Sequence, residues 1–132
     1  MPRYGIDTSI FVRLLTGDPM KDYEQTKTGL EQLLSADPAA EIEVSNLVIA
    51  EAYFALQHHY GVPKEDALMA LESVMTSGLV RPQNGQGVLA ALHEAHEPGL
   101  LDRLIAIDYA ANGLFTVTND KKMARLPRSL LL

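Results

Sequence analysis

Short apolar segments alternate with longer amphipathic segments along almost the whole chain, and this alternation constrains the fold more than any other feature. The short segments predict strands, and the longer ones predict helices because their apolar residues recur at helical spacing. Strands that alternate with helices favour a parallel sheet covered by helices on both faces. We therefore predict an α/β fold, a three-layer α/β/α arrangement around a central, mainly parallel sheet of four to five strands.

Turn and capping residues set the bounds of the expected elements. The expected strands cover residues 5–6, 41–44, 79–80, 114–118 and 130–132. The expected helices cover residues 10–16, 21–35, 47–59, 64–75, 87–96 and 101–112, and a last helical turn covers 121–125. Ser45 or Asn46 is expected to cap the third helix, and Gly113 to end the sixth.

Length and composition favour one domain without a membrane-spanning segment. A chain of 132 residues has the size of a single compact domain, so we assign residues 1–132 to one domain. No apolar run reaches the roughly 20 residues that span a bilayer, and no signal peptide is apparent. The absence of Cys excludes disulfides and thiolate metal sites, and it suits the cytoplasm.

The charge of the chain limits how it can meet nucleic acid. A net charge of −6 argues against sequence-blind binding through a broad basic surface. It leaves room for an enzyme whose acidic site holds cations. Basic residues outnumber acidic ones from Arg103 to the C-terminus, which by itself predicts only a solvated face.

Four acidic residues stand next to apolar segments, where a purely structural chain rarely needs them. Asp7 follows the first expected strand, and Asp120 follows the strand that ends at Thr118. Asp102 opens an apolar helix. Glu51 lies in the middle of another apolar helix, and its neighbours three and four residues away are apolar, so it is expected to point towards the core or its rim.

Each acid has a structural alternative. Asp7, Asp102 and Asp120 can be helix caps or first-turn acids, which free N–H groups and the helix dipole favour. Glu51 can form a salt bridge with an Arg, because a carboxylate on an apolar face needs a cation or a donor.

Taken together, the acids favour a metal site. Asp7 and Asp120 leave the carboxyl ends of strands, where open α/β sheets bind their ligands. Several carboxylates in one pocket repel one another unless cations balance them. Oxygen ligands suit Mg²⁺ or Mn²⁺, and such an ion can activate water for phosphodiester hydrolysis.

At these residues the sequence resembles the PIN-domain ribonucleases, and specifically the VapC-type toxins of toxin–antitoxin pairs. The resemblance covers nearly the whole chain and depends on the order and spacing of several short motifs. These are Asp7-Thr8-Ser9, Leu14-Leu15-Thr16-Gly17-Asp18, Glu51 in its apolar helix, Asp102-x-Leu104-Ile105-Ala106, Ala111-x-Gly113-Leu114 and Thr116-x-Thr118-x-Asp120.

The resemblance implies a Mg²⁺- or Mn²⁺-dependent endoribonuclease with Asp7, Glu51, Asp102 and Asp120 as its catalytic acids. It implies Asp7 and Asp102 as direct metal ligands and Asp120 as a further ligand, bound directly or through water. Glu51 would act through water or at a second metal. Ser9 and Thr118 would support the site by contacting a metal-bound water or a phosphate oxygen. No cofactor besides the metal is implied.

The resemblance also implies partners. These are an RNA substrate, a second copy of the chain in a homodimer, and a small antitoxin protein that assembles with the toxin. The antitoxin would lay an apolar segment into a groove near the site. We expect that groove to involve Phe11, Leu14 and Leu15 of the first helix and the helix over 47–59.

Three positions depart from the pattern of the family. Gly99 and Lys122 stand where many relatives carry further acids, and Asn119 stands where an aromatic residue is frequent. These changes favour an alternative, a non-catalytic or weakly active interaction module with the same fold. Lys121 and Lys122 can instead contact substrate phosphate.

Other motifs are weaker. The glycines at 85 and 87 lack the preceding strand of a dinucleotide-binding loop, and His93 and His96 lack zinc-site spacing. Asp108 is expected on a different helix face from Asp102. Phosphoryl transfer through an aspartyl-phosphate at Asp7 fits poorly, because Ser9 stands where a second Asp is needed.

Overall fold

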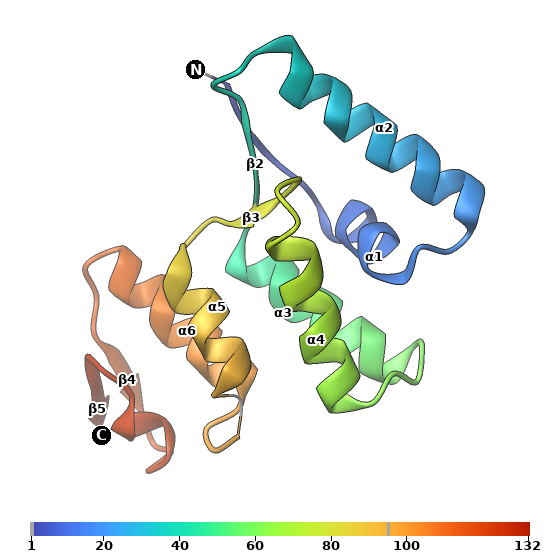
Figure 1. The fold of residues 1–132 in the computed structure, drawn as a ribbon. Coiled ribbons are helices and arrows are strands. Elements are labelled where there is room, and N and C mark those ends of the chain that lie inside the picture. Colours follow the sequence, from blue (N-terminus) through green and yellow to red (C-terminus); the bar gives the residue numbers. More distant parts are fainter. Residues whose placement is uncertain (1, 95) are drawn as a thin grey trace. The chain divides into compact units, whose positions relative to one another are not determined.

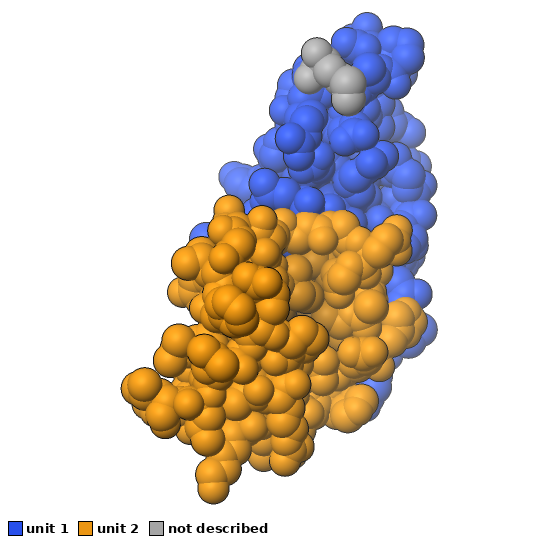
Figure 2. All heavy atoms as spheres, turned by 90° about the vertical axis from the view of Figure 1, so that its left-hand side faces the viewer, with its two compact units in different colours: residues 1–83 blue, residues 84–132 orange. Residues whose placement is uncertain are grey.

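A computed structural model describes residues 2–94 and 96–132 of the chain. The chain divides into two compact units, residues 1–83 and residues 84–132, which Figure 2 colours blue and orange. Each unit is described by itself below. The assignment of residues 1–132 to one domain stays a prediction.

The first unit contains a parallel sheet of three short strands, β1 (Arg3–Gly5), β2 (Glu41–Val44) and β3 (Arg81–Pro82), in the order β1-β2-β3. Tyr4 pairs with Ile42, and Val44 pairs with Pro82. The N–H of Gln83 donates to the carbonyl of Val44 at 2.8 Å, so the ladder continues past Pro82, which has no N–H of its own.

Four helices accompany this sheet: α1 (Thr8–Thr16), α2 (Met20–Ala36), α3 (Asn46–His58) and α4 (Lys64–Met75). Helix α1 packs against α2, α3 and α4, and α3 and α4 run side by side (Figure 1). Ser45 caps α3, because its Oγ accepts the N–H of Val48 at 3.2 Å. Gly17 ends α1 in the left-handed conformation, which glycine adopts without strain.

The core of the first unit is apolar and draws on β2 and on all four helices. Phe11 of α1, Val44 of β2, Ile49 of α3 and Leu71 of α4 are fully buried. Burial of these side chains packs α1 against α3 and against the sheet. Asp7 lies just before α1. The core therefore determines where the first predicted site residue lies.

The second unit contains two helices, a 3₁₀ turn and a two-stranded parallel sheet. The helices are α5 (Gln86–His93) and α6 (Leu100–Ala111), and the strands are β4 (Thr116–Thr118) and β5 (Ser129–Leu131), with η1 (Met123–Arg125) between them. Thr116 pairs with Ser129, and Thr118 pairs with Leu131. Val88, Leu92, Leu100, Leu104 and Met123 are buried and form its core.

The predicted class, α/β with parallel strands, is confirmed, since all three strand pairs are parallel. The described strands are hydrogen-bonded as a three-stranded and a two-stranded sheet and not as the predicted single sheet of four to five strands. Strand 41–44 and helix 64–75 have the predicted bounds. The strand predicted at 79–80 is wrong by two residues, because Arg81 and Pro82 make the pairing with β2. The helix predicted over 87–96 ends at His93, and residue 95 lies outside the described residues. Among the described residues, no helix combines the length and apolar character needed to cross a membrane.

Candidate active site

Asp7 lies between β1 and α1 and caps the helix. Its Oδ1 accepts the backbone N–H of Ile10 at 3.0 Å and the hydroxyl of Ser9 at 2.7 Å. The capping alternative for Asp7 is therefore confirmed, and Ser9, predicted to support the site, contacts this carboxylate directly. A cap uses one carboxylate oxygen, so this role leaves Oδ2 for another ligand.

The hydrogen bonds at Asp7 favour its charged form. The N–H of Ile10 and then the hydroxyl of Ser9 lower the pKa of the Asp7 carboxyl below its ordinary value, against a smaller opposing effect of desolvation. Asp7, like any Asp with an ordinary pKa, is a carboxylate at neutral pH, and these hydrogen bonds extend the charged form to lower pH. That is the protonation state which a hard cation requires of a ligand.

Glu51 lies on α3, and its carboxylate accepts a hydrogen bond from Thr8, the residue after Asp7. The distance from Thr8 Oγ1 to Glu51 Oε1 is 2.8 Å. Adjacent residues at the start of α1 thus contact the two acids, Ser9 contacting Asp7 and Thr8 contacting Glu51. The first unit therefore brings together two of the four predicted site residues.

Of the two predicted positions for Glu51, the core or its rim, the core is excluded, because its side chain is exposed. Two of its four apolar neighbours on α3 are exposed as well, Leu47 by 70% and Phe54 by 51%, and the other two are half-buried. Helical periodicity correctly placed Glu51 among apolar residues but did not reveal which face of α3 the first unit buries. Ile49, Ala52 and Leu56 form the buried face instead.

Asp102 and Asp120 both lie in the second unit. Asp102 is a partly buried acid in the first turn of α6, as its structural alternative predicted. Asp120 follows β4 and stabilises a tight turn, since its Oδ1 accepts the N–H of Lys122 at 2.8 Å. Thr118, the second supporting residue, accepts the N–H of Asp120 on its Oγ1 at 3.0 Å.

Glu97 is a neighbour of this second pair that sequence reasoning missed. Its Oε1 lies 2.9 Å from Nζ of Lys122. Lys122 lowers the pKa of Glu97, and the nearby charge of Asp120 acts in the opposite direction. Glu97 thus supplies an acid two residues before Gly99, the position at which this chain lacks the further acid of the family pattern. No periodic signal identified it, because it stands in a turn before Pro98.

The carboxylates have the chemistry that Mg²⁺ or Mn²⁺ prefers, which is oxygen ligation with room for water. Each unit supplies two of the predicted acids, Asp7 with Glu51 and Asp102 with Asp120. Within the described parts of the chain, no group of three or more Asp, Glu, His or Cys side chains is arranged to hold a metal ion.

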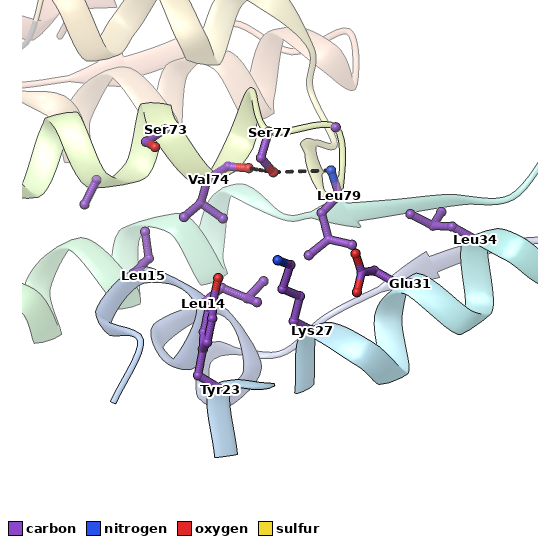
Figure 3. A pocket seen from close by; sticks show the side chains of 12 residues that line it. Leu14, Leu15, Tyr23, Lys27, Glu31, Leu34, Ser73, Val74, Ser77 and Leu79 are labelled. Carbon is purple, nitrogen blue, oxygen red and sulfur yellow. Dashed lines mark hydrogen bonds between the residues drawn. The ribbon is translucent and has the colours of Figure 1, made fainter. Parts of the chain in front are cut away.

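The first unit also contains an open pocket of about 630 Å³, with its lining residues drawn in Figure 3. Leu14 and Leu15 of α1 line it, whereas Phe11, the third α1 residue expected in a partner groove, is fully buried. The remaining lining comes from α2, which supplies Tyr23 and Lys27 among others, and from α4 and the turn after it. The helix predicted over 47–59 contributes no residue to this pocket.

Comparison with known proteins identifies the class to which this fold and these acids belong. The PIN domain family matches residues 4–129, which is nearly the whole chain. The chain therefore belongs to the PIN domain family, and the predicted PIN-like α/β fold class is confirmed. PIN domains are generally nucleases, so the family supports a hydrolase of nuclease type. No curated protein and no solved structure gave a significant match.

Proposed function

We propose that the chain is a Mg²⁺- or Mn²⁺-dependent endoribonuclease and the toxin component of a type II toxin–antitoxin pair. One observation carries the proposal: Asp7, held in its ionised form after β1, and Glu51 are linked through the adjacent residues Ser9 and Thr8. Helix capping alone explains why an Asp stands at position 7. It does not explain an exposed carboxylate on α3 that is hydrogen-bonded to the start of the same helix.

Asp7, Asp102 and Asp120 would hold the metal, and Glu51 would act through water or at a second ion. The metal would supply an activated water and stabilise the charge that develops on the phosphate during hydrolysis.

The other side chains have roles that follow from their contacts. Ser9 orients the carboxylate of Asp7, and Thr8 orients that of Glu51. Thr118 and the N–H of Lys122 hold Asp120 in its turn. These hydrogen bonds fix the orientation of the carboxylates, which reduces the reorganisation that metal binding would require.

The proposed partners are an antitoxin protein and a second copy of the chain. The pocket lined by Leu14, Leu15 and residues of α2 is a site in the first unit that an apolar antitoxin segment can enter (Figure 3). Lys27 and Glu31 also line it and can pair with charges that flank such a segment. Co-purification of the chain with the protein encoded beside it tests this part of the proposal.

RNA cleavage tests the enzymatic part. Purified protein is incubated with single-stranded RNA and Mg²⁺ or Mn²⁺, and Asp7→Asn and Asp102→Asn are compared with the wild type. Asp108→Asn is the matched control, since Asp108 is an exposed acid of α6 that accepts a hydrogen bond from Asn84 at 3.1 Å. We expect cleavage by the wild type and the control, and at least a hundredfold loss in the other two variants. Undiminished cleavage by Asp7→Asn would refute the proposed metal site.

A second candidate function is a non-catalytic interaction module, and Lys122 is the observation that favours it. This residue contacts Asp120 through its backbone and Glu97 through its ammonium group, so a cation already balances charge in this part of the chain. Metal titration separates the two functions. A folded, partner-free protein that binds no Mn²⁺ would support the module, and Mn²⁺ binding would support the nuclease.

A further inference from the structure

A second pocket in the first unit opens beside the acids on α1 and α3. Its volume is about 560 Å³, within the range of small-molecule sites. It lies between α1 and the C-terminal end of α3, and polar or aromatic side chains form much of its lining. The residues used in the argument below are Thr8, Ser9, Arg13, Asp18, His59 and Tyr60.

Two of these residues connect the pocket to the proposed catalytic acids. Thr8 donates to Glu51 at 2.8 Å, and Ser9 donates to Asp7 at 2.7 Å. The same two side chains line the pocket. Only the side chains of Thr8 and Ser9 therefore separate a molecule bound there from the carboxylates of Glu51 and Asp7. A substrate that is cut at these acids must extend into the space next to them on one side of the cleaved bond.

The pocket offers groups that suit a phosphate. Arg13 has a permanent positive charge. Nη1 of its guanidinium lies 2.7 Å from Oδ2 of Asp22, and its other N–H groups are able to donate to a phosphate. His59 adds a ring N–H donor at the end of α3. Phosphate contacts of this kind supply affinity without reading sequence.

Tyr60 offers a stacking surface for a base. Its side chain is 54% exposed although it lines the pocket. Its backbone is fixed, since its N–H donates to the carbonyl of Ala55 at 3.2 Å and Gly61 follows in the left-handed conformation. An exposed aromatic ring on an ordered backbone loses little entropy when a base stacks on it.

These features point to one class of ligand. We propose that the pocket binds one nucleotide of a single-stranded RNA next to the phosphodiester that is cut. The base stacks on Tyr60, and Arg13 and His59 contact the phosphate. Asp18, the acid in the lining, accepts a hydrogen bond from a ribose hydroxyl. The inference rests on the proposed nuclease function, because it assigns the pocket to the substrate of that site.

The direct test uses adenosine 5′-monophosphate and inorganic phosphate as probes of the wild-type protein in EDTA, followed by NMR. We expect the nucleotide to shift the backbone amide signals of Arg13, His59 and Tyr60. Tyr60→Leu should bind it about 5- to 150-fold more weakly, since stacking on an aromatic residue contributes that much per base. Tyr60→Phe keeps the ring and should bind like the wild type.

Arg13→Gln should also weaken binding, and Lys64→Gln is its control because Lys64 is an exposed cation at the start of α4 that does not line this pocket. The inference is overturned if Tyr60→Leu binds the nucleotide as well as Tyr60→Phe does. It is also overturned if phosphate alone binds as tightly as the nucleotide, since the base would then contribute nothing. Circular dichroism establishes that each variant is folded.

RNA cleavage separates this inference from the function on which it rests. If the wild type cleaves RNA and Tyr60→Leu leaves KM unchanged, the proposed nuclease function is supported and the proposed nucleotide pocket is refuted. If the wild type does not cleave RNA but binds the nucleotide through Tyr60, the pocket stands and the nuclease fails. A raised KM in Tyr60→Leu, with kcat nearly unchanged, supports both.

Discussion

Replacing Phe11 by Ala should destabilise the first unit strongly, because this side chain is at the centre of its packing. Phe11 is fully buried in α1, which packs against α2, α3 and α4. Truncation of a buried Phe to Ala costs about 3–5 kcal/mol in unfolding free energy. We expect the upper half of this range, since helices on several sides limit how far the cavity can collapse. The loss is a large part of the roughly 5–15 kcal/mol that stabilises a typical domain.

Urea unfolding followed by circular dichroism measures this loss. Phe54→Ala is the matched control, because Phe54 is 51% exposed on α3 and loses much less burial. We expect it to cost less than about 1 kcal/mol, as most exposed substitutions do. The reasoning about packing would be refuted if the two variants lost the same free energy, because α1 would then not be the element around which the unit packs.

Two further predictions follow from the pKa shifts. The folded state lowers the pKa of Asp7, so its carboxylate adds stability above its ordinary pKa, and that stability is lost as the pH falls through the lowered value. Asp7→Asn should therefore flatten the dependence of unfolding free energy on pH below about pH 4, and an unchanged slope in denaturant melts would contradict this. Lys122→Gln should raise the pKa of Glu97 towards its ordinary value, as read from carboxyl ¹³C shifts, whereas Lys121→Gln should not.

Local signals predicted the regular elements well. The turn over residues 61–63 predicted the start of α4 at Lys64, and the alternating residues 41–44 gave β2 its bounds. Ser45 was one of two expected caps, and its hydroxyl makes the capping hydrogen bond. These predictions succeeded because each depends on neighbours in sequence.

Side-chain exposure could not be predicted in the same way. Periodicity placed Glu51 with Leu47 and Phe54 on one face of α3, which is correct. Whether the face is covered depends on how segments far apart in sequence pack, and the first unit leaves it exposed. The contact between Thr8 and Glu51 likewise depends on the packing of α1 against α3.

Glu97 shows the same limit for the site itself. It contacts Lys122 only because α6 and β4 place the two turns together, and neither residue belongs to a periodic pattern. The four acids were identified from their apolar surroundings and from a family resemblance. The membership in the PIN domain family is confirmed, and the joint role of the acids stays a prediction.

Mn²⁺ titration of the partner-free protein tests most directly whether the predicted acids bind a metal ion. Binding is measured by calorimetry for the wild type, Asp7→Asn, Asp102→Asn and the control Asp108→Asn. The account predicts that Asp7→Asn and Asp102→Asn each bind Mn²⁺ at least tenfold more weakly than the wild type, and that the control binds normally. Wild-type affinity in either Asp7→Asn or Asp102→Asn would contradict it.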